Sequence, residues 1–293
     1  MTAASPQHAR VAKPARRRFL AQRSARSPIA VAGITLSLMT LLLAILGPKL
    51  TRADPLNVDL GRQFMSPSMQ AWFGTDELGR DLLSRCLSGI GLSLSSALIV
   101  TAVAVVLGIL VGGTAGFLGG SIDNVLMRIT DMFLAFPALV LALAIAAALG
   151  PSLRNAVLAV AVVWWPWYAR MVRAQVMSVK ETAYIEAAEA TGVRPARIFF
   201  RHILPNCMAP VMVMASTDMG AVVLTTAGLN FIGLGAKPPT PELGAMVSQG
   251  RLYLLDYWWV PTFPGLVILF MVLGFNLLGD ALRDWLDPQL RGL

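Results

Sequence analysis

The stretch best suited to a specific contact is residues 180–192, which read Lys-Glu-Thr-Ala-Tyr-Ile-Glu-Ala-Ala-Glu-Ala-Thr-Gly. Alanine and glutamate are strong helix formers, so this composition predicts a short surface helix. Ala187 and Ala188 give the helix a nearly smooth side that another backbone can approach closely, and Glu186 adds charge. Gly192 is typical of a helix C-terminus. The expected chemistry is docking, although an ordinary amphipathic helix at a membrane interface has a similar composition.

A second short helix is predicted directly after the glycine. Pro195 suits the first turn of a helix, where its missing N–H is not needed. Pro205 disfavours helix at the residue before it and is expected to end this second helix. The result is a helix, a glycine turn and a helix between two longer apolar stretches. Such a rigid knob is suited to transmitting force from a soluble partner.

The chain lacks the residue patterns that most catalytic and metal sites need. Its only histidines are His8 and His202, and its only cysteines, Cys86 and Cys207, lack metal-ligand spacing. No Gly-Lys dipeptide occurs, so the phosphate-binding pattern of ATPases cannot be written anywhere. We therefore expect no catalytic residue, no metal and no cofactor in this chain. Any ATP and Mg²⁺ would be bound by a partner.

The elements around this stretch are expected to be membrane spans. Of the 293 residues, 56% are hydrophobic and 14% are charged, against about 25% charged in a soluble domain. A span needs about 20 apolar residues. Gaps between charged residues predict six spans in an all-α polytopic fold, the fourth marginal, in the segments 27–48, 94–118, 132–153, 155–169, 208–229 and 257–279. Residues 86–93 are read as a surface helix.

The charge distribution predicts the orientation of these spans. Seven Lys and Arg residues and no acid precede the first span, which places the N-terminus in the cytoplasm. A twin-arginine signal at Arg16–Arg18 is the alternative, but no small-residue cleavage site follows the apolar run. The net charge of +8 is thus explained by membrane sidedness rather than by nucleic acid.

The predicted spans and their orientation together give the organisation of the chain, in order: a basic cytoplasmic tail (1–27), the first span (28–49), an extracytoplasmic segment (50–93), a five-helix core (94–280) and a cytoplasmic C-terminal tail (281–293). The core includes the cytoplasmic loop 180–206 and an extracytoplasmic loop 230–257. Three prolines between residues 238 and 241 are expected to stiffen the second loop.

A few ionisable residues stand out against this background. Asp218 lies inside a predicted span, where such groups line a pathway, face a subunit interface or make a local hydrogen bond. Asp131 is expected to pair with Arg128, one turn away. The remaining candidates are extracytoplasmic and either contact a binding protein or cap the following helix, with Asp76 as the N-cap candidate; they are Asp76, Arg80 and Asp81.

The stretch around residue 186 resembles the cytoplasmic loop of ABC importer permeases. That family spaces Glu-Ala-Ala, three residues, Gly, and later Leu-Pro. The matching positions here are Glu186, Ala187, Ala188, Thr191 (the residue before the glycine), Gly192, Leu204 and Pro205. His202 stands where the broad consensus has Ile. A His-x-x-Pro-Asn ending is usual in the peptide/nickel subfamily, and residues 202–206, His-Ile-Leu-Pro-Asn, fit it. Residues 73–85, 127–131, 136–137, 228–235 and 279–288 also resemble that subfamily's second permease subunit.

The resemblance implies a type I permease fold in a bacterial inner membrane and a specific mechanism. The loop would dock in a cleft of a cytoplasmic ATPase, with Glu186 as its anchor and Gly192 as its turn. The implied partners are a homologous permease, two ATPase subunits, an extracytoplasmic solute-binding protein and the lipid bilayer. The implied cargo is short peptides, with nickel, an opine or another small solute as alternatives. An ion-coupled secondary transporter is a further alternative. Such a transporter needs ionisable residues inside its spans, and Asp218 is the one residue that qualifies.

Overall fold

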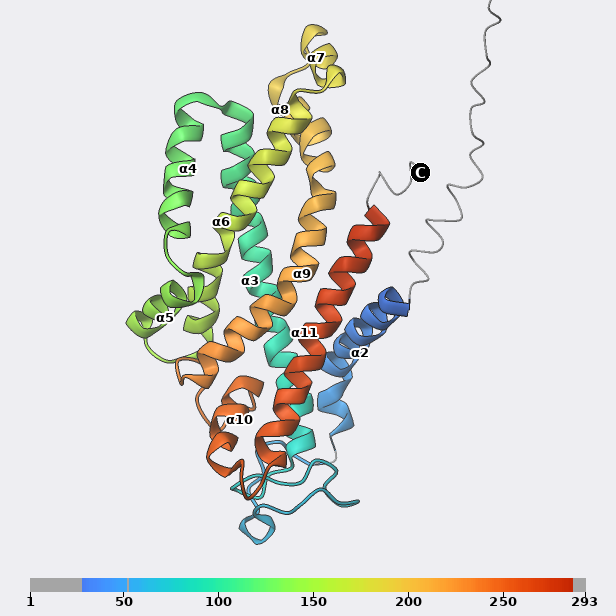
Figure 1. Cartoon of the computed structure of the whole chain (residues 1–293), viewed down its shortest axis with the longest axis vertical. Helices are drawn as coiled ribbons and strands as arrows, with labels where there is room; N and C mark the ends of the chain where they lie inside the picture. Colours follow the sequence, from blue (N-terminus) through green and yellow to red (C-terminus); the bar gives the residue numbers. More distant parts are fainter. Residues whose placement is uncertain (1–27, 52, 287–293) are drawn as a thin grey trace, which may run out of the picture.

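The computed structural model describes residues 28–51 and 53–286, and these form a helical protein (Figure 1). The described part contains no strand, only one isolated bridge between Thr75 and Asp81. The predicted all-α fold is therefore confirmed. The basic tail 1–27, with His8, lies outside the described residues.

In chain order the elements are α2 (Pro28–Leu50), η1 (Leu60–Arg62), α3 (Leu82–Leu118), α4 (Gly120–Leu134), α5 (Ala138–Leu149), α6 (Leu153–Lys180), α7 (Ala183–Ala190), α8 (Pro195–Ile198), η2 (Phe199–Ile203), α9 (Leu204–Phe231), α10 (Leu243–Gly250), η3 (Arg251–Tyr253) and α11 (Trp259–Leu286).

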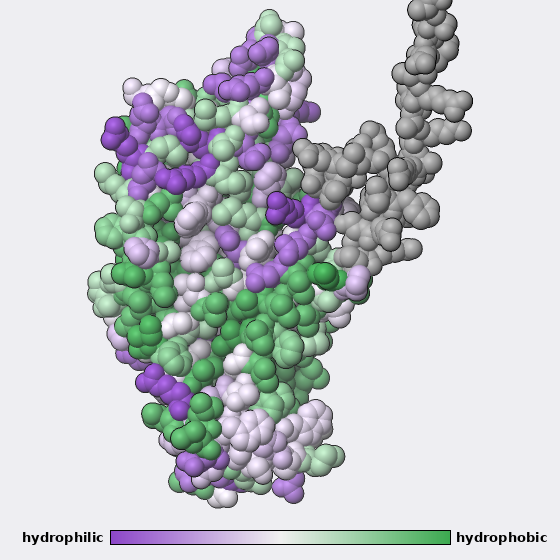
Figure 2. All heavy atoms as spheres, viewed as in Figure 1, coloured by the Kyte–Doolittle hydropathy of each residue, from purple (hydrophilic) through white to green (hydrophobic). Residues whose placement is uncertain are grey.

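Four helical stretches of the described chain are long and apolar enough to cross a membrane, namely α2, α3, α8 to α9, and α11. The bent pair α4 and α5 makes up to five. Helix α6 has 28 residues and packs along α3, but it is not among these apolar stretches, so the count of six spans stays a prediction. Figure 2 shows a broad apolar belt between more polar ends. Only 22% to 39% of the residues in the four apolar windows are buried, so these helices present much apolar surface outward.

Two ends of the molecule can be distinguished in Figure 1. The α7 end carries α7 and α8, together with the last turns of α3 and α6. The α10 end carries α10, the segment between α2 and α3, and the start of α11. The N-terminus of α2 and the C-terminus of α11 point toward the α7 end without reaching it.

The third predicted span is not one straight helix. Helix α4 ends at Leu134, Pro137 caps α5, and the two helices meet at an angle of 85°. Proline has no N–H and disfavours helix at the preceding residue, so the helix breaks at Phe136. Helix α5 has only 12 residues. It is about 18 Å long and too short to cross the hydrocarbon core alone.

The expected surface helix before the second span is instead the buried beginning of α3. Ser93 and Ser96 are both buried, as is Gly89. A Cβ at Gly89 would lie 2.7 Å from the carbonyl oxygen of Pro241, so this part of α3 packs directly against the loop that precedes α10. The low hydropathy of residues 88–96 thus indicates small side chains at a tight contact rather than exposure to water.

Helices α3 and α6 share the largest interface of the fold, and it depends on three glycines one turn apart. A Cβ at Gly108 would overlap Tyr168, and a Cβ at Gly112 would overlap the carbonyl group of Ala169. A Cβ at Gly116 would lie 2.9 Å from the carbonyl oxygen of Arg173. Small residues at every fourth position let two membrane helices approach backbone to backbone. The same spacing is readable in the sequence, although our sequence analysis did not use it.

Two ion pairs join α4 to α6. Arg173 binds Asp123 through both arms of its guanidinium group, at 2.5 and 2.6 Å. Arg170 binds Asp131 at 2.6 Å. The predicted pair between Asp131 and Arg128 is therefore wrong, because α6 brings Arg170 to the carboxylate from another helix.

We predict that Gly112→Ala will weaken the contact between α3 and α6. The added methyl group overlaps backbone that cannot move independently, and overpacking of this kind costs about 1–3 kcal/mol. The measurement is the apparent melting temperature of the purified complex in detergent, which should fall. Gly228→Ala is the matched control, because a Cβ there has no neighbour within 4 Å. An equal effect of both substitutions would contradict the close-contact explanation.

Candidate functional site

Helix α7 projects from the end of the molecule and exposes one continuous side. Glu186, Ala187 and Glu189 are exposed, whereas Ile185 is fully buried and Ala188 is half-buried. Ile185 belongs to an apolar cluster that also contains Ile198 of α8. The predicted surface helix is therefore present, and one isoleucine holds it on the rest of the protein while the Glu-Ala-Ala side stays free.

The turn after α7 requires a glycine for its backbone rather than for space. Gly192 has a φ of +75°, and a Cβ there would have no neighbour within 4 Å. The N–H of Gly192 donates to the carbonyl oxygen of Glu189 at 2.9 Å, and the N–H of Val193 donates to that of Ala188 at 3.2 Å. The Thr191 hydroxyl adds bonds to the carbonyl oxygens of the last turn. These bonds close the end of α7 and reverse the chain toward α8.

Pro205 does not end the second helix, as the sequence analysis expected. The chain stays helical from Pro195 to Phe231. Residues Phe199–Ile203 form a π-turn, in which the N–H of Leu204 donates to the carbonyl oxygen of Phe199. This wider turn leaves room for the Pro205 ring just after it, so the helix continues instead of breaking. The chain after the turn at Gly192 thus leads through α8 and the π-turn into α9 without interruption.

Two further side chains tie α7 to α9. The Asn206 side-chain amide donates to the hydroxyl of Tyr184 at 3.1 Å and to the carbonyl oxygen of His202 at 2.6 Å. His202 itself is half-buried, and it takes part in these bonds through its backbone carbonyl oxygen. The sequence analysis included Asn206 only as the end of a motif and assigned no role to Tyr184. Neither has a recognisable signal in the sequence alone, because the pair meets only when the chain reverses at Gly192.

The base of α7 is also fixed to α3. Lys180, the last residue of α6, donates from Nζ to the carbonyl oxygen of Phe117 at 2.9 Å. The Phe117 and Phe199 rings lie 5.2 Å apart, which joins the end of α3 to the π-turn. The segment around α7 is therefore in contact with α3 and α6 as well as with α9.

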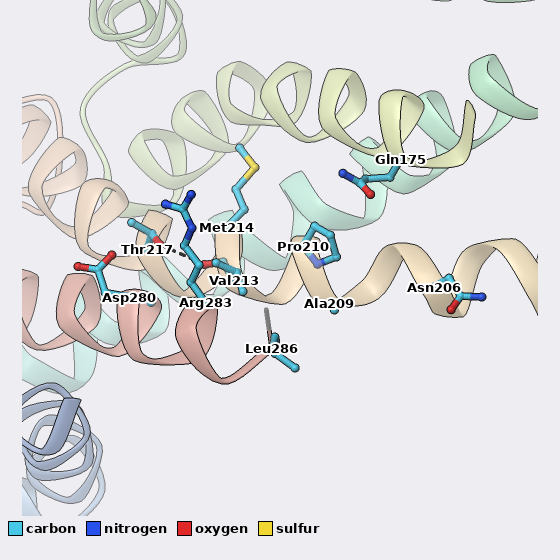
Figure 3. Close-up of a pocket in the computed structure, with 11 residues that line it drawn as sticks. Gln175, Asn206, Ala209, Pro210, Val213, Met214, Thr217, Asp280, Arg283 and Leu286 are labelled. Atoms are coloured by element: carbon cyan, nitrogen blue, oxygen red, sulfur yellow. Dashed lines mark hydrogen bonds between the residues drawn. The ribbon is translucent and has the colours of Figure 1, made fainter. Parts of the chain in front are cut away.

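A pocket of about 620 Å³ lies farther along α9, between α6, α9 and α11 (Figure 3). Its polar lining residues are Gln175, Asn206, Thr217, Asp280 and Arg283.

The candidate Asp218 is not among the residues that line this pocket. Its carboxylate accepts a hydrogen bond of 3.1 Å from the indole N–H of Trp164. The buried hydroxyl of Tyr168 lies near the same carboxylate without forming a hydrogen bond of good geometry. Asp218 therefore makes the local bond that the sequence analysis weighed as one alternative, and its role in a pathway or at a subunit interface stays a prediction.

Two of the three charged candidates at the α10 end, Asp76 and Arg80, form an internal cluster. Asp76 and Arg80 have side chains only 4% and 3% exposed, and their ion pair measures 2.7 Å. Arg85 lies 3.4 Å from the same carboxylate. Asp81, not Asp76, caps α3 by accepting from the N–H of Ser84 at 2.8 Å. A direct contact of Asp76 or Arg80 with a binding protein is therefore wrong for this conformation, because both are covered by their own chain.

One buried acid at the α10 end escaped the sequence analysis. Glu242 is 1% exposed and caps α10 through a bond of 2.9 Å from the N–H of Ala245. The hydroxyl of Ser93 on α3 donates to it at 3.2 Å. Burial raises the pKa of Glu242 to about 7. An acid just before a helical run is a readable capping signal, but its burial under α3 depends on the fold.

Comparison with known proteins places this geometry in a family. The family model described as "Binding-protein-dependent transport system inner membrane component" matches residues 104–292. The chain is 47% identical over 266 residues to the probable D,D-dipeptide transport system permease protein DdpC of Escherichia coli K12, covering 91% of this chain and 89% of that protein. It is 42% identical over 266 residues to the dipeptide transport system permease protein DppC of Alkalihalophilus pseudofirmus, covering 91% and 88%. It is 39% identical over 241 residues to the nickel transport system permease protein NikC of Escherichia coli K12, covering 81% and 86%.

Solved structures agree on the fold. The MetNI methionine ABC transporter, in an inward-facing conformation, matches with a TM-score of 0.58 at 19% identity, over 69% of this chain and 96% of that chain. An amino acid ABC transporter solved with histidines matches with a TM-score of 0.54 at 19% identity, over 67% and 91%. The fold and the family predicted from the loop motif are thus confirmed. The chain belongs to the inner membrane components of binding-protein-dependent transport systems.

Proposed function

We propose that this chain is the second permease subunit of an ATP-driven importer of short peptides, and that α7 docks on a cytoplasmic ATPase. The observation that carries the proposal is that α7 is exposed on one side and attached to the rest of the protein on the other. Glu186 and Ala187 are exposed, while the buried Ile185 and the bond from Asn206 to Tyr184 hold the helix to the rest of the protein. A surface with small side chains and one or two charges suits insertion into a cleft. Because α7 is firmly attached to the permease, a movement of the ATPase around α7 would move the permease helices.

The movement would pass along α9 to the pocket. Residues 195 to 231 form one helical path, so a pull on α7 acts on a lever about 55 Å long. Asn206 and Thr217 both line the pocket that faces α6 and α11. ATP binding and hydrolysis, with the Mg²⁺ that they need, are assigned to the partner ATPases. Closure of two ATPases would then switch the permease between inward-facing and outward-facing states.

In this proposal the α7 end is cytoplasmic and the α10 end is extracytoplasmic. The excess of Lys and Arg before α2 and around α7 supports that orientation. A homologous permease and lipid would cover the apolar surface that the helices present outward. A solute-binding protein would dock at the α10 end and two ATPases at the α7 end. The buried cluster around Asp76 would shape that outer surface rather than touch the binding protein.

Short peptides are the proposed cargo. The relatives named as dipeptide permeases are 47% and 42% identical to this chain, and the relative named as a nickel permease is 39% identical. The deciding experiment is ATP-dependent uptake of labelled di- to pentapeptides, with nickel in parallel, into vesicles that carry the whole complex. Peptide uptake supports the proposal. Uptake of nickel alone would leave the permease role intact and change the substrate.

We predict that Glu186→Lys will abolish coupling without preventing assembly. Reversing a charge at the centre of the docking face places like charges where complementary charges are needed, and peptide uptake should fall at least about tenfold. The measurement is initial uptake rate, together with recovery of the intact complex by size-exclusion chromatography. Glu181→Lys is the matched control, because Glu181 is equally exposed but precedes α7. Normal transport by the Glu186 variant would refute the docking role of this residue.

We predict that Asn206→Ala will separate ATP hydrolysis from transport. The substitution removes the side-chain hydrogen bond that joins α7 to α9, worth about 1 kcal/mol, together with a local bond to His202, so the ATPase would move a loosened loop. The number of peptides transported per ATP should fall about two- to fivefold while ATP hydrolysis continues. Tyr184→Phe removes the same bond between α7 and α9 from the other side and should lower the ratio to a similar extent. An unchanged transport ratio in both variants would show that this bond does not transmit movement.

A further inference from the structure

Glu242 lies at the point where three elements of the α10 end meet. Its carboxylate accepts hydrogen bonds from Ser93 on α3, at 3.2 Å, and from the first turn of α10, at 2.9 Å. The side chain of Asn230, at the end of α9, lies beside it, and its Nδ2 atom is buried without a hydrogen-bond partner. The one acid thus contacts α3, α9 and α10 at once.

The packing around Glu242 is too close for α10 to move without breaking these contacts. A Cβ at Gly244 would overlap the backbone of Ala227 on α9, and a Cβ at Gly89 on α3 would lie 2.7 Å from the Pro241 carbonyl oxygen. Glu242 itself is 1% exposed. Separation of α10 from α3 and α9 therefore exposes the carboxyl group to water, and the packed arrangement buries it.

Among the described residues, no charged side chain offsets this burial. The groups that act on Glu242 are the N–H groups of Ala245 and Gly244, the Ser93 hydroxyl and the Asn230 amide. The nearest cation along α3 is Arg85, which is engaged with Asp76 and with the carbonyl oxygens of Pro55 and Pro239. Lys237, in the loop before α10, is exposed. A carboxylate buried in this way favours its neutral form.

We propose that Glu242 is a positioning residue for transport, which holds α10 between α3 and α9 while it is protonated and releases α10 when it loses its proton. The proposal rests on the function proposed above, in which the α10 end is the outer side that must open to receive the cargo. The chemical signal is the proton concentration on that side of the membrane.

The direction of the effect follows from linkage. The pKa of Glu242 is about 7 in the packed arrangement, against an ordinary value of 4.5 when it is hydrated. The packed arrangement binds the proton more tightly, so it is stable at low pH and is weakened as the pH rises from 4.5 through 7. Between pH 6 and pH 8 the equilibrium between packed and open forms should shift about tenfold toward the open form.

Cys86 provides an intrinsic reporter of this opening. It lies on α3 one turn before Gly89, is 1% exposed, and belongs to the same buried cluster as Leu243 of α10. The experiment uses the whole complex in lipid nanodiscs without peptide and follows the labelling of Cys86 by a membrane-impermeant maleimide, with mass spectrometry to locate the label. Rates are divided by those of a free cysteine peptide at the same pH, which removes the pH dependence of the thiol itself.

The wild-type labelling rate is expected to rise about tenfold from pH 6 to pH 8. Glu242→Gln, which mimics the protonated acid, should label slowly at every pH. Asp256→Asn is the matched control, because Asp256 is an exposed acid at the same end, and it should keep the wild-type rise. A flat wild-type profile, or a Glu242→Gln profile that rises like the wild type, would overturn the proposal.

A second variant tests the same proposal if the Glu242 variant does not assemble. The Ser93 hydroxyl stabilises the carboxylate, so Ser93→Ala should move the midpoint of the labelling profile to higher pH. A merely structural role would change the labelling rate by the same factor at all pH values and would contradict the proposal. Because labelling needs neither peptide nor ATP, an error in the proposed cargo would leave this result unaffected.

Discussion

The backbone contact between α3 and α6 is the constraint on which the rest of the structure depends. Gly108, Gly112 and Gly116 let the two helices meet with no side chain between them. In a bilayer the hydrophobic effect does not drive helices together, so close van der Waals contact has to hold them. The end of α6 carries α7, and the start of α3 receives the α10 end. The same contact therefore supports both ends of the molecule.

Charged groups are arranged around this frame in two different ways. Asp123 with Arg173 is an ion pair that joins α4 to α6, and the cluster around Asp76 closes one turn through Arg80 and reaches Arg85 on α3. Each acid in these pairs has a cation within hydrogen-bond distance, so its charge is compensated where it stands. Glu242 is the contrasting case, since only neutral hydrogen bonds offset its burial. A buried acid without a cation responds to protons, whereas a paired acid serves to fix geometry.

Helix α9 links the two ends through one helical path. Its first turns follow the π-turn that accommodates Pro205, and its last residues reach Asn230 beside Glu242. A movement that begins at α7 and a proton that binds at Glu242 therefore act on the same element. This arrangement gives a physical route by which conditions on one side of a membrane influence an event on the other. The pocket between α6, α9 and α11 lies on that route.

The sequence by itself determined the membrane class, the family and the helix–glycine–helix of the docking loop, because these depend on composition and on short spacings such as Glu186 to Gly192. It did not determine which partner each charged group takes or how deeply each is buried. Asp131 binds Arg170 instead of Arg128 because α6, distant in sequence, supplies the partner. Asp76 pairs with Arg80 and is buried instead of exposed. The protonation behaviour of Glu242 also belongs to the tertiary structure, because burial arises only when α3, α9 and α10 pack around one carboxyl group.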